Sequence, residues 1–129
     1  MRETSMRRFL TVIACTLAVV SSARAEGDPS AGAAVYAQCA ACHAVGAGAQ
    51  SNVGPALNDI VGRRAGTHPG FRYSSALRKS GLTWDEATLA QYLRAPDKVV
   101  PGTKMAFPGI ASDKDIADVI AYLKQQTTK

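Results

Sequence analysis

The chain has 129 residues, of which 47% are hydrophobic and 6% aromatic, and its formal net charge is +5 at pH 7. A chain of this length accommodates one small domain, and we find no internal repeat or second domain. The first 25 positions hold four of the fifteen basic residues and one of the ten acidic residues, so residues 26–129 carry a formal charge of +2. The basic balance is therefore partly a property of the N-terminal segment.

Residues 1–25 have the pattern of a cleaved export signal. Basic residues precede an apolar run from Phe9 to Val20, and Ala23-Arg24-Ala25 matches a signal-peptidase site. The run is shorter than the roughly 20 residues that span a bilayer. A lipid-attachment box at Cys15 and a twin-arginine signal at Arg7-Arg8 are the weaker alternatives. We expect cleavage after Ala25, which leaves Glu26–Lys129 as a single domain of 104 residues.

The next segment predicts a helix followed directly by a cofactor-attachment motif. Asp28 and Pro29 suit the N-cap and first residue of a helix that continues to about Ala37. The motif is Cys39-Ala-Ala-Cys42-His43. Two thiols at this spacing can add to the vinyl groups of a haem, and the adjacent histidine then lies under the iron. The motif therefore predicts one covalently bound c-type haem.

Other uses of a Cys-x-x-Cys pair fit this chain less well. A thioredoxin-like centre needs a strand before the motif, and no strand pattern flanks it. Structural zinc usually takes four ligands, and after residue 25 the chain offers two thiols, His43 and His68. A disulfide remains a minor alternative for an exported protein.

The remainder of the chain alternates loops with short helices. Val45–Pro55 and Gly62–Gly70 are rich in small and turn-forming residues and are expected to be loops. Residues 74–80 predict a short helix closed by Gly81. Thr83-Trp84-Asp85-Glu86 predicts a capping box for a helix through about Arg94.

Beyond Arg94, prolines at 96 and 101 are expected to interrupt the chain until a final helix begins. Ser112 is the expected N-cap of that helix, whose apolar residues recur at helical spacing: Ile116, Val119, Ile120 and Leu123. Met105, in the preceding loop, is the single methionine after residue 25. A thioether can supply the second axial bond to a haem iron and raise its reduction potential, so elimination selects Met105.

The apolar inventory is small for a chain with long loops. A domain of this kind often needs a cofactor to complete its core, and burial of the apolar haem ring contributes several kcal/mol at about 25 cal/mol per Å². We therefore predict that the chain without haem is largely unfolded.

Taken together, these motifs closely resemble the class I cytochrome c family. The resemblance spans nearly all of Gly27–Lys124 and is carried by Cys39-Ala-Ala-Cys42-His43, Gly54-Pro55-Ala56-Leu57, Gly62-Arg63, Gly70-Phe71-Arg72-Tyr73-Ser74, Leu82-Thr83-Trp84, Tyr92-Leu93 and Pro101-Gly102-Thr103-Lys104-Met105-Ala106-Phe107. It implies a small all-α cytochrome c fold. About four or five helices would wrap around one covalently bound haem, with the N- and C-terminal helices crossed.

The resemblance also implies roles for individual side chains. His43 and Met105 would be the axial iron ligands, and His43 would donate its free ring N–H to the carbonyl of Pro55. The inner haem propionate would be held by Arg63, Tyr73 and Trp84, and hydroxyls near the methionine sulfur would come from Tyr92 and Thr103. A plain core position is the alternative for Trp84 and Tyr92.

A further set of residues is expected to have no functional role. Tyr36 and Tyr122 are interpreted as structural residues of the crossed helices, together with Gly32. His68, in a loop of Gly and Pro, is expected to be exposed and without a function.

The implied function is single-electron transfer without catalysis. The partners would be membrane redox complexes, with a cytochrome bc1-type donor and an oxidase, reaction centre or reductase as acceptor, in the periplasm. We expect a monomer that binds neither nucleic acid nor a small-molecule substrate. Residues 63–104 carry a local excess of +5, which predicts transient electrostatic docking with an acidic partner. A haem enzyme or gas sensor with an open iron position is the competing class.

Overall fold

The computed structural model describes residues 26–128, so the predicted export signal lies outside the described residues. The helices of that part of the chain are α1 (Pro29–Tyr36), α2 (Ser75–Lys79), α3 (Glu86–Arg94), α4 (Pro96–Val99) and α5 (Asp113–Lys124). Over the same residues the β contact is one isolated antiparallel bridge between Arg64 and Thr83. The expected all-α fold is therefore confirmed.

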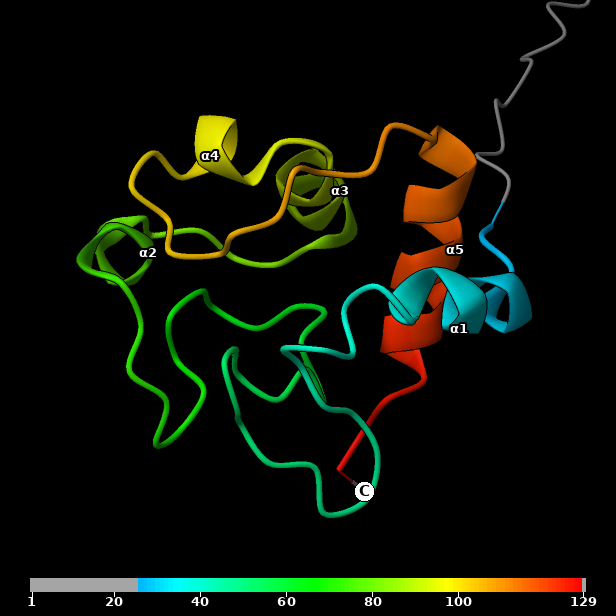
Figure 1. The fold of residues 1–129 in the computed structure, drawn as a ribbon, viewed down its shortest axis with the longest axis horizontal. Helices are drawn as coiled ribbons and strands as arrows, with labels where there is room; N and C mark the ends of the chain where they lie inside the picture. The colour runs from blue at the N-terminus through cyan, green and yellow to red at the C-terminus, as the bar shows by residue number, and fades with distance from the viewer. Residues whose placement is uncertain (1–25, 129) are drawn as a thin grey trace, which may run out of the picture.

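The helices lie around a long, irregular segment. Figure 1 shows α1 against α5 at one end of the molecule, α2 and α4 at the other end, and α3 between them. Residues 37–74, between α1 and α2, contain no helix and form the lower side of the molecule in this view. Within residues 26–128 no helix combines the length and the apolar character that a membrane crossing requires.

Side-chain caps begin most of these helices where the sequence predicts them. Asp28 accepts a hydrogen bond from the backbone N–H of Ser30, and Ser112 accepts one from that of Asp115. The expected N-cap of α3 is wrong, however. Asp85, not Thr83, caps α3, because Thr83 is held in the bridge to Arg64 and cannot also begin a helix.

The short helix α4 was not expected from the sequence. Pro96 was expected to break the chain, but it is instead the first residue of this short helix. Proline is tolerated there because the N–H that it lacks would have no partner inside the helix. α4 leads the chain from α3 toward the loop that contains Met105.

The crossing of α1 and α5 requires a glycine. A Cβ atom on Gly32 would lie 1.9 Å from the carbonyl oxygen of Asp118, so the two backbones are in direct contact there. The rings of Tyr36 and Tyr122 pack next to this contact, with centroids 5.3 Å apart. The predicted crossed terminal helices and the structural role of both tyrosines are confirmed.

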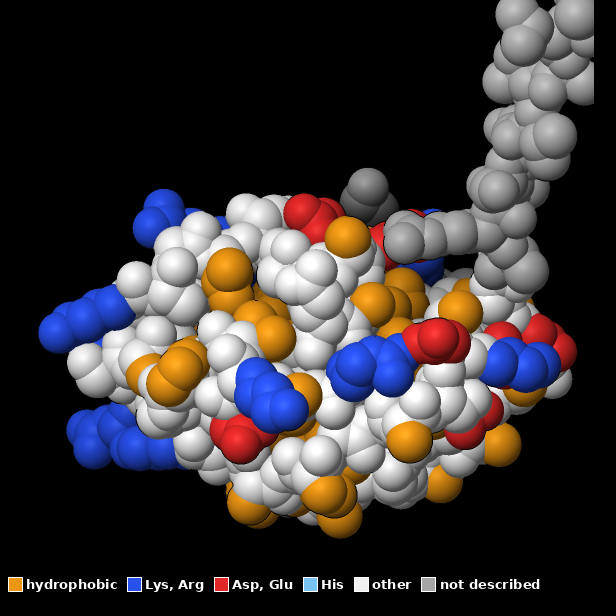
Figure 2. All heavy atoms as spheres, turned by 90° about the horizontal axis from the view of Figure 1, so that it is seen from above, with side chains coloured by type: hydrophobic (Ala, Val, Ile, Leu, Met, Phe, Trp, Pro, Cys, Tyr) orange, Lys and Arg blue, Asp and Glu red, His pale blue; other side chains and the backbone are white. Residues whose placement is uncertain are grey.

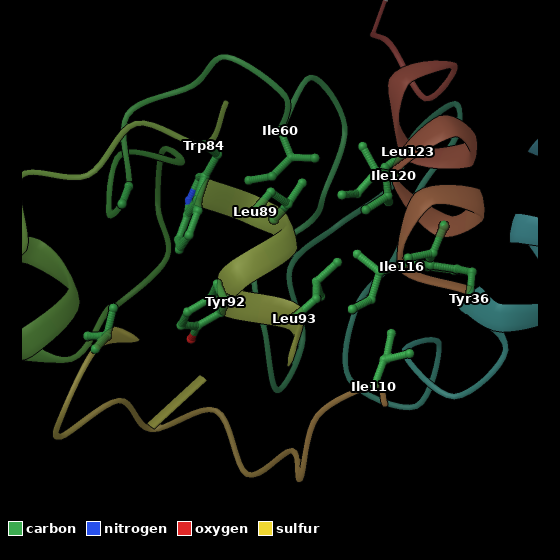
Figure 3. Close-up of a cluster of buried hydrophobic side chains, with 13 residues drawn as sticks. Tyr36, Ile60, Trp84, Leu89, Tyr92, Leu93, Ile110, Ile116, Ile120 and Leu123 are labelled. Carbon is green, nitrogen blue, oxygen red and sulfur yellow. The ribbon is translucent and has the colours of Figure 1, made fainter. Parts of the chain in front are cut away.

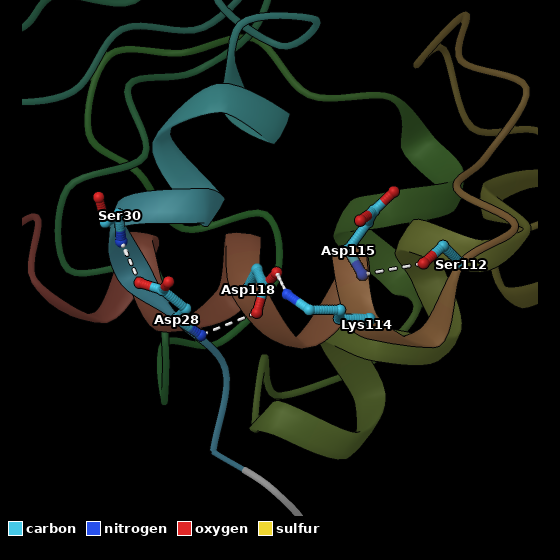
Figure 4. Close-up of polar contacts among 6 residues, drawn as sticks. All are labelled: Asp28, Ser30, Ser112, Lys114, Asp115 and Asp118. Atoms are coloured by element: carbon cyan, nitrogen blue, oxygen red, sulfur yellow. Dashed lines mark hydrogen bonds and ion pairs between the residues drawn. The ribbon is translucent and has the colours of Figure 1, made fainter.

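A buried carboxylate ties the start of α1 to α5 (Figure 4). Asp118 is 3% exposed and accepts a 2.8 Å hydrogen bond from the backbone N–H of Asp28. Its second oxygen accepts from the ammonium group of Lys114, one turn earlier on α5. Both oxygens therefore have partners, as burial of a charge requires.

The hydrophobic core lies between α3 and α5. Figure 3 shows Leu89 and Leu93 directed from α3 toward α5, whereas Trp84 and Tyr92 lie on the other side of α3. Both aromatic side chains are buried, at 5% exposure each. α3 thus packs one face on α5, while Tyr92, and Trp84 just before the helix, lie on its other side.

Candidate functional site

The two cysteines lie in a helical turn that continues α1. The backbone N–H of Cys39 donates to the carbonyl of Tyr36 at 2.7 Å, and that of His43 donates to the carbonyl of Cys39 at 3.0 Å. Cys39 and Cys42 form no disulfide and are half-buried, and Cys39 packs against the core. Burial raises the pKa of the Cys39 thiol, with a smaller contribution from Cys42. The motif is therefore anchored to the crossed helices.

The imidazole of His43 is held in one orientation. Its Nδ1 lies 2.7 Å from the carbonyl oxygen of Pro55, so Nδ1 carries the proton and donates. The expected His43–Pro55 hydrogen bond is thus present. Burial lowers the pKa of His43, partly offset by this bond. The lowered pKa favours the neutral ring, whose Nε2 keeps a lone pair for a metal.

The face of the His43 ring packs on a glycine. A Cβ atom at Gly54 would lie 2.3 Å from Cε1 and 2.8 Å from Nε2 of His43. The backbone N–H of Gly54 also donates to the carbonyl of Cys42 at 2.8 Å. The segment from Gly54 to Pro55 therefore fixes the ring by close contact as well as by hydrogen bonding.

Tyr36 connects this segment to the helix crossing. Its hydroxyl donates to the backbone carbonyl of His43 at 2.9 Å. Burial raises the pKa of Tyr36 to about 12, so the hydroxyl keeps its proton and remains a donor. A residue interpreted as structural thus also holds the backbone of the candidate ligand.

Met105 lies in a loop that is organised by two hydroxyl groups. The hydroxyls of Tyr92 and Thr103 are 2.8 Å apart, and the Thr103 oxygen also accepts from the backbone N–H of Met105 at 3.3 Å. The Met105 side chain is half-buried and packs against the core. Burial raises the pKa of Tyr92. The structure brings together the three residues that the family resemblance grouped here.

Arg63 and Trp84 are brought together by backbone pairing. The N–H of Trp84 donates to the carbonyl of Arg63 at 2.8 Å, and the N–H of Gly62 donates to the carbonyl of Trp84 at 2.7 Å. Tyr73 is buried on the same loop system, and its hydroxyl accepts from the backbone N–H of His68 at 3.0 Å. The three residues expected around a propionate therefore share one local framework.

The guanidinium of Arg63 has an unsatisfied atom. Its Nη1 donates to the carbonyl of Asn58 at 3.0 Å and contacts Nδ1 of His68 at 3.3 Å, but its buried Nη2 has no partner among the described residues. A buried cationic donor left in this way requires an anionic or polar acceptor. A haem propionate supplies such an acceptor, so the residues present fit the cofactor.

The expectation that His68 is exposed is wrong. The residue is half-buried, and Nδ1 of its ring contacts Nη1 of Arg63 at 3.3 Å. Burial lowers the pKa of His68, and the charge of Arg63 lowers it further. A Gly/Pro-rich sequence indicates a turn but does not indicate which side chain the turn covers.

Asn58 was also not singled out from the sequence. Its side chain is 4% exposed and bonds both the N–H and the carbonyl of Gly46, at 2.8 Å each. It closes the loop after the motif, while its own carbonyl holds Arg63. An isolated asparagine carries no sequence signal that separates this role from an ordinary turn.

The fold and the site define a helical protein that attaches haem covalently through a Cys-x-x-Cys-His segment. The family model for cytochrome c matches residues 29–127. This chain belongs to the cytochrome c family.

Relatives and solved structures agree with this assignment. The chain is 51% identical to cytochrome c2 of Rhodomicrobium vannielii over 91% of this chain and 94% of that protein. It is 54% identical to cytochrome c2 of Rhodoblastus acidophilus over 77% of this chain and 92% of that protein. The structure of cytochrome cH from Methylobacterium extorquens matches with a TM-score of 0.74 and 50% identity, covering 78% of this chain and all of that one. Covalently bound haem c is the cofactor of this family, and electron transport is its function.

Proposed function

We propose that this protein carries single electrons, with His43 and Met105 as the axial ligands of a low-spin haem iron. The observation that carries the proposal is the fixed His43 ring, whose Nδ1 bonds Pro55 at 2.7 Å and whose Nε2 is thereby left for the iron. Met105 is the single methionine after residue 25, and Thr103 anchors its backbone. A histidine and a methionine together favour a high reduction potential.

We assign the remaining contacts to binding and orientation. Cys39 and Cys42 would form the thioethers, and Pro55 would keep His43 in place. Arg63, with Tyr73 and Trp84, would hold a propionate, which supplies the partner that Nη2 of Arg63 lacks among the described residues. Tyr92 and Thr103 would fix the loop that presents Met105. The haem, when bound, supplies the ferric/ferrous couple.

Two axial protein ligands would leave the iron without an open position. Catalysis on oxygen, peroxide or another small molecule requires such a position, so we propose a carrier and not an enzyme. Rigid ligands also favour rapid electron transfer, because the surroundings of the iron rearrange little between its two oxidation states.

The proposed partners are membrane redox complexes, reached from the periplasm after cleavage following Ala25. Figure 2 shows basic side chains gathered at the end of the molecule where Figure 1 places α2, with no acidic side chain among them on that face. Arg78 and Lys79 belong to that helix. Such asymmetry steers encounter with an acidic surface, so the second-order rate should fall as salt rises. A rate independent of salt would contradict this docking mode.

The ligand assignment is tested by replacing the sulfur. We expect the ferric protein to show the weak red absorption band of methionine-ligated haem and the ferrous protein to resist carbon monoxide. Met105→Ala should lose the band, bind carbon monoxide and have a lower reduction potential. The matched control is Val53→Ala, because Val53 is an exposed side chain. A band that survives in Met105→Ala would refute the assignment.

A further inference from the structure

His68 occupies a position from which it can act on the proposed propionate site. Arginine is always a donor, so the 3.3 Å contact requires an unprotonated Nδ1 on His68 that accepts from Nη1 of Arg63. The backbone N–H of His68 is fixed by the hydroxyl of Tyr73 at 3.0 Å. The imidazole of His68 therefore contacts Arg63, while Tyr73 fixes the backbone of His68. Both Arg63 and Tyr73 are proposed propionate-binding residues.

We propose that His68 is a redox-linked proton-binding residue, which takes up a proton when the protein is reduced and acts through Arg63. The proposal rests on the proposed function, since it requires that Arg63 bind a propionate. During reduction the redox partner donates one electron, and solvent supplies a proton to Nδ1 of His68. Oxidation returns both.

The coupling follows from the two states of the imidazole. Neutral His68 accepts from Arg63, whereas protonated His68 loses that bond and places a second cation beside the guanidinium. The ferric state carries one more positive charge than the ferrous state, so a cation at His68 disfavours the ferric state. Protonation therefore raises the reduction potential, and reduction must raise the pKa of His68 by the reciprocal amount.

The surroundings of His68 set the pH range of the effect. Among the described residues, the ionisable side chains in contact with His68 are Arg63, whose Nη1 lies against the imidazole, and Tyr73, whose hydroxyl binds the backbone N–H. Histidine is the residue type whose ordinary titration range lies between about pH 5 and 8. Burial, and then the charge of Arg63, lower the pKa of His68, which moves the response toward lower pH.

The first experiment measures reduction potential against pH on the holoprotein. The potential of the wild type should fall as pH rises through the histidine range. His68→Gln cannot titrate but keeps an oxygen that can accept from Arg63, so its potential should be nearly independent of pH there. The matched control is Arg64→Gln, which removes a cation from an exposed neighbouring side chain. Its potential should shift downward while the pH dependence stays.

The second experiment reads the proton directly. The chain has two histidines, and His43 is the proposed iron ligand, so His68 should give the one titrating histidine signal in proton NMR. Its pKa should be about 0.3 units higher in the ferrous than in the ferric protein, as expected when the extra charge of the ferric iron acts on His68 across a partly solvated region. This measurement uses the wild type and does not depend on the folding of any variant.

The outcomes separate this inference from the proposed function. Equal His68 pKa values in the two oxidation states would overturn the inference. An unchanged pH dependence of the reduction potential in His68→Gln would also overturn it, because the titrating group would then be the propionate itself. Absence of the methionine–iron band would instead overturn the ligand assignment. The NMR titration would still decide whether His68 responds to the oxidation state.

Discussion

The candidate iron ligand His43 is positioned by backbone atoms more than by side chains. The carbonyl of Pro55 accepts from its Nδ1, and the α-carbon of Gly54 leaves room for its ring. The hydroxyl of Tyr36 binds the His43 carbonyl at 2.9 Å. Contacts of this kind fix ring orientation and make the imidazole a better ligand. Even a one-carbon change beside the ring should therefore affect ligation.

Gly54→Ala tests this steric requirement. The added Cβ would stand 2.3 Å from Cε1 of His43, so the ring or the segment from Gly54 to Pro55 must shift. We expect a loss of about 1–3 kcal/mol in the free energy of unfolding, as for other overpacked sites, together with an altered ferric spectrum. Gly48→Ala is the control, because Gly48 has a φ of +72° and no atom lies near its Cβ position. It should cost about 1–2 kcal/mol through backbone strain and leave the spectrum unchanged. Equal spectra in both variants would contradict the proposed contact.

At the level of single residues, the sequence reveals those whose chemistry is carried by a local pattern. The Cys39–His43 segment was expected from a short motif, whereas its link to Pro55 and the group around Met105 were expected from the family resemblance. His68 was misinterpreted, since its contact with Arg63 depends on how a turn folds over a side chain five positions earlier. The burial of Asp118 was missed because it depends on the close approach of two helices that are distant in sequence.

Among the helices, α1 and α5 form the unit on which the candidate site is built. Gly32 permits backbone contact, and Asp118 joins the two helices through the N–H of Asp28. The turn that carries both cysteines continues directly from α1. Any loosening of this crossing should therefore move the attachment segment. The sequence predicts both helices from their caps and periodicity. The start of α3 was not predicted because it depends on the contact between Thr83 and Arg64, and α4 was not predicted because it begins with a proline.

Asp118→Asn tests the polar tie between these helices by its pH dependence. The hydrogen bond from Lys114 and then that from Asp28 hold the pKa of the Asp118 carboxyl below its usual value. A lowered pKa in the folded state means that the stabilisation is present above the usual aspartate pKa of about 4 and is lost as pH falls through the folded value. The variant should be destabilised at neutral pH and lose less stability than wild type on acidification.

The control for this prediction is Asp115→Asn, which removes the same charge from the same helix but leaves the contact with Asp28 intact. Urea denaturation of the holoprotein at pH values from neutral to about 3 gives the stability curves. If Asp118→Asn and Asp115→Asn have the same acid dependence, the tie does not contribute in the way described.

In the molecule as a whole, regular structure covers only part of the chain. Residues 37–74 connect α1 to α2 without a helix. Their buried apolar side chains are few: Ala56, Ile60, Ala65 and Tyr73. Their backbone is held by local bonds such as those of Asn58 to Gly46, and by the N–H of Asp59 donating to the carbonyl of Gln126 in the C-terminal tail. Such contacts alone do not offset the conformational entropy of a segment of this length.

Covalent haem should therefore be required for folding, and removing both thiols tests this. Cys39→Ala/Cys42→Ala should give a chain with little helical circular dichroism and no cooperative thermal transition, because the segment between α1 and α2 would lack the cofactor expected to complete its core. Cys42→Ala alone keeps one thioether and should retain a cooperative transition at lower temperature. A fully helical, cooperatively melting double variant would mean that the terminal helices and α3 suffice to hold residues 37–74, and that the cofactor is inserted into a fold already formed.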